Sequence, residues 1–137
     1  MCVNIISLTA QALPRWVTDL GVAMTPKQGE ELREQICTHS GDFYDHCGED
    51  AEWTNEYEQE LFLKDNGIES AYLVVECRHH TRVWWEKRPI GWEKMTDSKA
   101  KVLGAYVELN DGQTTQTKRL KLSAREVATL THALNIQ

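Results

Sequence analysis

The chain has 137 residues, of which 41% are hydrophobic and 26% charged, and its formal net charge is −6. This composition is typical of one soluble globular domain and excludes a disordered chain. Apolar runs such as AYLVV at 71–75 have strand length, and the first residues lack the features of a secretion signal. We therefore expect a single domain over residues 1–137, located in the cytoplasm and without a membrane partner.

The charge is distributed unevenly along the chain. Residues 42–69 contain ten acidic residues and one basic residue, whereas residues 70–137 contain seven acidic and eleven basic residues. This asymmetry predicts an acidic surface and a mildly basic region on the same domain.

Helical patterns dominate the first third of the chain. The run between Pro14 and Gly21 has a start and an end typical of a short helix. Thr25 and Pro26 predict the start of a second helix, which should end between Cys37 and Gly41. Before both, VNIISL at 3–8 fits either a strand at a sheet edge or a buried coil.

Residues 51–66 fit two periodicities. Trp53, Tyr57 and Leu61 recur every four residues and Gly67 follows, which favours a third helix. Tyr57, Leu61 and Leu63 also fit the period of two that is typical of a strand. We predict the helix.

From residue 70 the sequence becomes typical of β-structure. Four segments rich in β-branched and aromatic residues cover 70–79, 81–87, 101–109 and 114–122. His79 and His80 are placed at a hairpin between the first two, and Asn110, Asp111 and Gly112 at a turn between the last two. This predicts a four-stranded antiparallel meander, with a fifth strand if VNIISL pairs with it.

The end of the chain predicts an amphipathic helix. Ser123 and Glu126 form a capping-box pattern, and Val127, Leu130 and Leu134 make an apolar stripe. The expected fold is α+β, with N-terminal helices, an antiparallel sheet, and a C-terminal helix packed on one sheet face.

Thiols and imidazoles near residue 40 raise the possibility of a metal site. Cys37, His39, His46 and Cys47 have the ligand types that zinc prefers, although their spacing differs from that of common zinc sites. The alternative interpretation is small buried cysteines and solvated histidines. No nucleotide or catalytic motif is present, so we expect no enzyme and no cofactor, with a zinc-stabilised domain as the alternative.

A basic and tryptophan-rich stretch suggests nucleic-acid binding. The stretch contains cations that could neutralise phosphates and rings that could stack on bases; these residues are Arg82, Trp84, Trp85, Lys87 and Arg88. Because Trp84 and Trp85 point to opposite sides of a strand, one ring should enter the core. The other ring is either the stacking platform or is covered by a helix or loop.

The acidic segment suggests a third kind of surface, in which carboxylates steer a basic protein partner and aromatic side chains anchor it. The candidate residues are Asp42, Phe43, Tyr44, Asp45, Glu49, Asp50, Glu52, Trp53, Glu56, Tyr57 and Glu60. The favoured function is therefore a small binding protein, for example an inhibitor or nucleic-acid mimic directed against a nucleic-acid-handling complex. A nucleic-acid-binding module is the alternative function.

Overall fold

The computed structural model describes residues 13–47, 50–64, 68–111 and 117–134, with the side chains of 39–47 and 111 left out. It has helices, a four-stranded antiparallel sheet and a C-terminal helix, which confirms the predicted α+β class. The VNIISL segment and Gly112 lie outside the described residues.

The main sheet is built from β2 (Ala51–Glu60), β4 (Ile68–Arg88), β5 (Gly91–Asp111) and β6 (Thr117–Lys121), in that order and with every pair antiparallel. A second sheet pairs β1 (Val22–Ala23) with β3 (Phe62–Leu63). The main sheet is therefore four-stranded and antiparallel, as predicted, but its strands differ from the predicted ones: β2 was not expected as a strand, and the predicted strands 70–79 and 81–87 are both part of β4.

The predicted helix over residues 51–66 is wrong, because this segment forms β2 and β3. Along β2, the side chains from Trp53 to Gln59 alternate between a covered face and an exposed face that carries Thr54, Glu56 and Glu58. A helix would have mixed these glutamates with Tyr57, whereas the strand separates the two kinds of side chain completely. The strand-like alternation of residues in this segment is therefore the correct signal, and the helix-like spacing of Trp53, Tyr57 and Leu61 is not.

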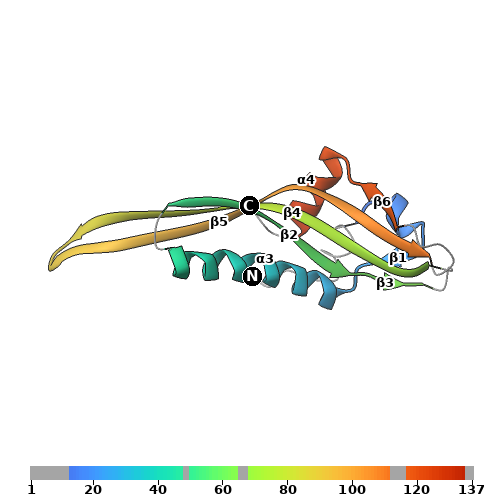
Figure 1. Cartoon of the computed structure of the whole chain (residues 1–137), viewed down its shortest axis with the longest axis horizontal. Helices are drawn as coiled ribbons and strands as arrows, with labels where there is room; N and C mark the ends of the chain where they lie inside the picture. Colours follow the sequence, from blue (N-terminus) through green and yellow to red (C-terminus); the bar gives the residue numbers. More distant parts are fainter. Residues whose placement is uncertain (1–12, 48–49, 65–67, 112–116, 135–137) are drawn as a thin grey trace.

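The predicted hairpin at His79 and His80 is also wrong. Both residues lie within the continuous β4, where His79 pairs with Trp53 on one side and with Ala100 on the other. The chain reverses instead after Arg88, and β5 starts at Gly91, whose φ of 136° is a conformation that favours glycine. The expected second strand is thus the outer part of β4, which together with β5 projects far beyond the rest of the molecule (Figure 1).

The helices begin largely where expected. α2 covers Arg15–Thr18, and α3 covers Pro26–Cys47. At the start of α3, the side chains of Thr25 and Gln28 each accept a hydrogen bond from the other's backbone N–H. The predicted end of this helix near Gly41 is wrong, because one glycine costs a helix only about 1 kcal/mol and does not by itself stop it.

The C-terminal helix α4 (Ala124–Ala133) has the predicted capping box, in which Ser123 and Glu126 satisfy each other's backbone N–H groups. Glu126 also accepts a hydrogen bond from the indole of Trp16 in α2, which connects the two ends of the described chain. Burial alone would raise the pKa of Glu126, but these hydrogen bonds from Ser123 and Trp16 outweigh it and lower the pKa.

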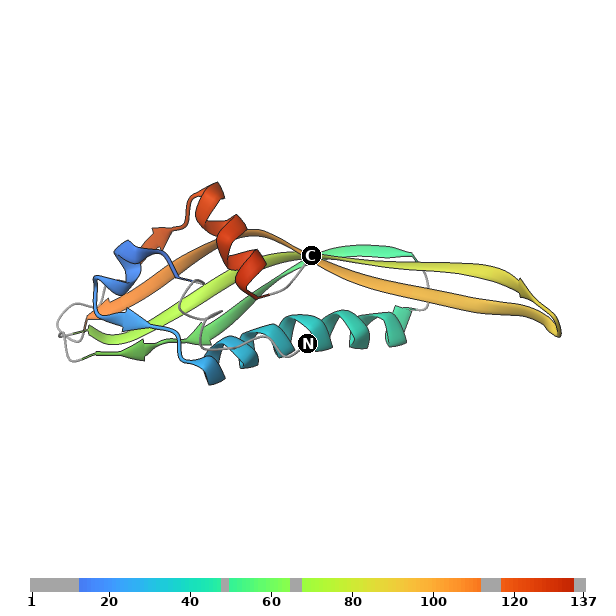
Figure 2. The same cartoon turned by 180° about the vertical axis from the view of Figure 1, so that it is seen from behind.

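One hydrophobic core lies between the sheet and its helices. Leu32 and Ile36 of α3 and Leu130 of α4 join side chains from one face of the sheet, such as Leu73 and Val107. Figure 2 shows α3 along one side of the sheet and α4 near β5 and β6. No described helix is both long enough and apolar enough to cross a membrane.

Candidate binding surfaces

One surface of the main sheet, opposite the side packed on α3 and α4, concentrates carboxylates. Strand β2 exposes glutamates on this outer face, and the register places a further glutamate of β4 directly opposite Glu56. We call this set the acidic face, and it consists of Glu52, Glu56, Glu58, Glu60 and Glu76, all of which are exposed.

The acidic face carries net negative charge, although Arg78 of β4 lies on the same side, opposite Thr54 and between Glu52 and Glu56. Glu56 and Glu76 are direct cross-strand neighbours, and like charges in that position cost about 0.2–1 kcal/mol. Glu108, on β5, instead lies 3.7 Å from the guanidinium of Arg119. Among the residues that the structure describes, no ion pair engages a member of the acidic face. The negative potential is therefore available to a partner.

The aromatic side chains predicted as anchors on β2 do not share this face. Tyr57 is only 5% exposed, and its hydroxyl oxygen lies 2.6 Å from Nε2 of the fully buried His79. Trp53 stacks on the same imidazole, with 4.8 Å between ring centroids. Burial raises the pKa of Tyr57, and a hydrogen bond with Asn55 offsets part of that effect. Both rings therefore connect β2 to β4 on the helix side.

The outer face has tyrosines of its own. Tyr72 pairs with Glu60 across β2 and β4, and Tyr106 of β5 belongs to the same side of the sheet. Both are partly exposed, and the guanidinium of Arg119 lies 5.2 Å from the centre of the Tyr106 ring. Sequence reasoning missed these two rings, because only the strand register brings them next to the glutamates of β2.

The other residues of the predicted acidic surface are separated from this face. The Asp50 carboxylate accepts a hydrogen bond from the backbone N–H of Val83, just beyond the last β2–β4 pair. Asp42, Phe43, Tyr44 and Asp45 lie on the last turns of α3, where the described structure gives the backbone only. Glu49 lies outside the described residues.

The four predicted metal ligands lie along one helix. Because α3 continues to Cys47, Cys37 is separated from His46 and Cys47 by about 14 Å along the axis, at about 1.5 Å per residue. The side chains of Cys37, His39, His46 and Cys47 in one copy of this helix are too far apart to coordinate a single tetrahedral ion. No metal-binding cluster is found among the side chains that the structure describes.

A further thiol and imidazole, those of Cys77 and His79 in β4, are engaged in the core. Cys77 is fully buried in the core, and burial is the main reason that its pKa rises to about 12. A thiol with this pKa stays protonated at neutral pH and is a poor nucleophile or metal ligand. Its neighbour His79 is held by Tyr57 and Trp53.

The residues predicted to contact nucleic acid lie on the projecting part of the hairpin, but on two different faces. The guanidinium of Arg82 lies 5.7 Å from the centre of the Trp84 ring, and the Trp84 indole donates to Glu86. Arg88 belongs to this same face. Trp85 and Lys87 alternate with them and therefore point to the opposite side. The five residues do not form one surface.

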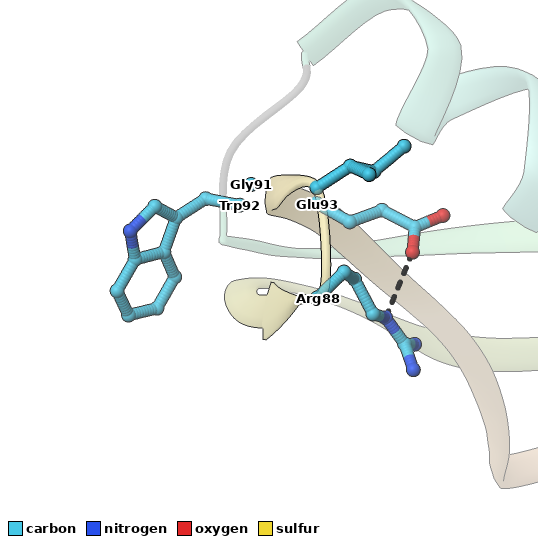
Figure 3. Close-up of a pocket in the computed structure, with 5 residues that line it drawn as sticks. Arg88, Gly91, Trp92 and Glu93 are labelled. Carbon is cyan, nitrogen blue, oxygen red and sulfur yellow. Dashed lines mark hydrogen bonds and ion pairs between the residues drawn. The ribbon is translucent and has the colours of Figure 1, made fainter.

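Around the tip, side chains lie on both sides of the hairpin. Figure 3 shows Arg88 directed toward Glu93, with 2.9 Å between Nε and Oε2, while Trp92 projects away from both. These residues, together with Ile90 and Gly91, line a shallow hollow that is open to solvent. Trp92 and Lys94 belong to the same basic and tryptophan-rich stretch of the sequence but were not among the five predicted contact residues. The turn after Arg88 places Trp92 opposite Lys87 and Lys94 opposite Trp85.

Comparisons of the chain with models of protein families, with curated proteins and with solved structures found no match. The class defined by the structure itself is an α+β protein with a curled antiparallel sheet, a charged outer face and a long projecting hairpin.

Proposed function

We propose that the protein is a binding protein whose acidic face docks onto a basic surface of another protein. The observation that carries the proposal is the set of glutamates on one side of β2, at positions 52, 56, 58 and 60 with Thr54 between the first two, extended by Glu76 across the register. Alternate residues of a strand are about 7 Å apart, so Glu56, Glu58 and Glu60 present regularly spaced negative charge. Regular negative charge is what a basic nucleic-acid-binding groove recognises, and a mimic or inhibitor of that kind fits this face.

The energetics support use of the face rather than solubility alone. Placing Glu56 opposite Glu76 destabilises the sheet, and the same net charge could be distributed without a direct cross-strand pair. A basic partner would relieve this repulsion when it binds. Tyr72 and Tyr106 add partly exposed aromatic surface beside the glutamates, in the place of Trp53 and Tyr57.

The test compares two variants of equal charge in affinity capture from the native host, followed by titration of the purified partner. The first variant carries Glu52→Gln, Glu56→Gln and Glu58→Gln on the acidic face. The control carries Asp19→Gln, Glu30→Gln and Glu34→Gln, which are exposed residues away from that face.

A basic protein should bind the wild type and the control about equally. Surface charge interactions contribute about 0.5 kcal/mol each, so three of them predict a loss of about tenfold in affinity for the acidic-face variant. The affinity for the wild type should also fall as salt is added. Equal binding by the two variants would overturn the proposal.

A further inference from the structure

The outer half of the β4–β5 hairpin forms an arm, which we define as residues 82–97. Strand β2 pairs with β4 only as far as Thr81, so the arm consists of two strands alone. Both views show it projecting away from the helices (Figures 1 and 2). No core residue of the described chain lies between Thr81 and Val102, so the arm contributes little to the core and its side chains are exposed on a narrow ribbon.

One face of the arm carries only aromatic, cationic and uncharged side chains. Trp85 pairs across the strands with Lys94, and Lys87 pairs with Trp92. The two pairs are adjacent, so tryptophans and lysines alternate in a square on the same side. We call these four residues the Trp/Lys face. Trp85 is 60% exposed and Trp92 is 67% exposed, which is unusual for side chains of this size.

The carboxylates of the arm are all on its other face, where they are paired. Arg88 lies 3.0 Å from Glu86 and 2.9 Å from Glu93, and Lys99 lies 3.9 Å from Asp97. By contrast, no ion pair engages Lys87 or Lys94 among the described residues. The arm therefore neutralises one face and leaves two ammonium groups beside two exposed indoles on the other.

The acidic face does not cancel the charge of these ammonium groups. Glu52, the member of the acidic face closest to the arm, pairs with His80, and Lys87 is seven residues further along β4. Seven residues of strand span about 23 Å, nearly three times the screening length of about 8 Å at physiological salt. An anionic ligand at the Trp/Lys face is thus largely screened from the acidic face.

We propose that the Trp/Lys face is a binding site for single-stranded nucleic acid. The indoles of Trp85 and Trp92 stack on unpaired bases, and the ammonium groups of Lys87 and Lys94 contact the phosphates between them. Bases in a duplex are already stacked on each other and cannot cover these rings, so a single strand is the ligand that matches both parts of the face. This site is independent of the acidic face and of its proposed protein partner.

The test uses the full chain and fluorescein-labelled oligothymidylate of 20 nucleotides, with anisotropy measured at low and at physiological salt. Trp85→Ala and Trp92→Ala should each weaken binding by about tenfold, which lies within the usual range for loss of a base–aromatic stack. Replacing both lysines, as Lys87→Gln with Lys94→Gln, should reduce the slope of log affinity against log salt by about 1.4, at about 0.7 per single-strand phosphate.

A matched control removes the same charge from the side of the hairpin opposite the Trp/Lys face, as Arg82→Gln on the arm with Lys99→Gln next to the arm, and should bind within about twofold of the wild type. The binding of each protein is also measured to three other ligands: the same 20-mer annealed to its complement, poly-glutamate, and anionic vesicles. Four results would each overturn the proposal: no binding of the single strand at low salt, a duplex bound as tightly, poly-glutamate or vesicles bound in its place, or an equal loss in the control.

A variant that lacks residues 83–96, closed by a short turn, gives a second and independent measurement. Because the core residues lie outside the arm, the rest of the chain should stay folded, and this variant should keep the far-ultraviolet circular dichroism expected of those residues. It should lose the single-strand binding completely. Retained binding would place the site elsewhere on the molecule and refute the assignment to the Trp/Lys face.

Discussion

Replacement of Tyr57 by phenylalanine tests whether the helix side of β2 is held by its contact with a buried imidazole. The hydroxyl oxygen of Tyr57 lies 2.6 Å from Nε2 of His79, and the two residues are 5% and 0% exposed. Loss of the hydroxyl removes one hydrogen bond and leaves the imidazole nitrogen without that partner in the core. Such a loss costs about 1–3 kcal/mol in the free energy of unfolding.

Urea unfolding followed by tryptophan fluorescence would measure this cost, and the midpoint temperature should fall by about 3–12 °C for a domain of this size. Tyr72→Phe serves as the control, because the structure gives its partly exposed hydroxyl no hydrogen bond to a described residue. A cost below about 0.5 kcal/mol for Tyr57→Phe, or an equal cost for Tyr72→Phe, would refute the reasoning.

Three further changes test other parts of the fold. The pKa of Cys77 rises from 9.0 in an exposed thiol to about 12 in the folded chain. The unfolded chain therefore loses this proton first, so the free energy of unfolding should decline between about pH 9 and pH 12. Cys77→Ala should show a shallower decline in the same urea titrations, and an unchanged slope would contradict the burial effect. Ser123→Ala removes the cap of α4 and should cost about 1 kcal/mol in thermal unfolding, whereas Ser123→Asp should retain most of the stability. Asp50→Ala removes the acceptor of the Val83 amide and should speed hydrogen exchange at that amide by about two- to tenfold, with exchange in the body unchanged. Exchange that increases throughout β2 would instead indicate a general loss of stability.

Several structural features that depend on residues close together in the sequence were predicted correctly. The capping box of Ser123 with Glu126, and the start at Thr25 and Pro26, depend on contacts within four residues. Such contacts lie between residues that are close in the sequence, so these two helix starts were predicted correctly. The pairing of the last two predicted strands followed from their short connection, because consecutive antiparallel strands usually pair.

The errors arose where two patterns competed or where the deciding contact is distant in sequence. Glutamates on alternate residues of β2 were visible, but the spacing of Trp53, Tyr57 and Leu61 was given more weight. His79 and His80 were placed at a turn, although the residues suited to a turn, Pro89 and Gly91, lie further on. Burial of His79 depends on Tyr57, which is 22 residues away, and no local pattern indicates it.

The candidate surfaces likewise combine features that are visible in the local sequence with features that depend on contacts between distant residues. The acidic segment was apparent from charge alone, but only the register shows that Glu76 joins it while Trp53 and Tyr57 leave it. The basic and tryptophan-rich stretch was also apparent. Its division into a paired face and the Trp/Lys face depends on which residues of β4 and β5 are opposite each other, and that depends on the position of one turn.

Surfaces of opposite charge on one chain remain usable only if they cannot reach each other. A cationic segment on a flexible linker would fold back onto the glutamates and neutralise them. Here β4 and β5 are continuous strands that extend from the four-stranded part of the sheet into the arm, so the ribbon holds the two surfaces apart.

We therefore expect the acidic-face variant and Trp85→Ala to act independently. Sites farther apart than about 10 Å usually add within about 0.5 kcal/mol. Single-strand affinity should be the same, within about twofold, for Trp85→Ala with and without the three glutamine substitutions. A larger change would show that the glutamates do act on the arm, and that the ribbon does not separate the two surfaces.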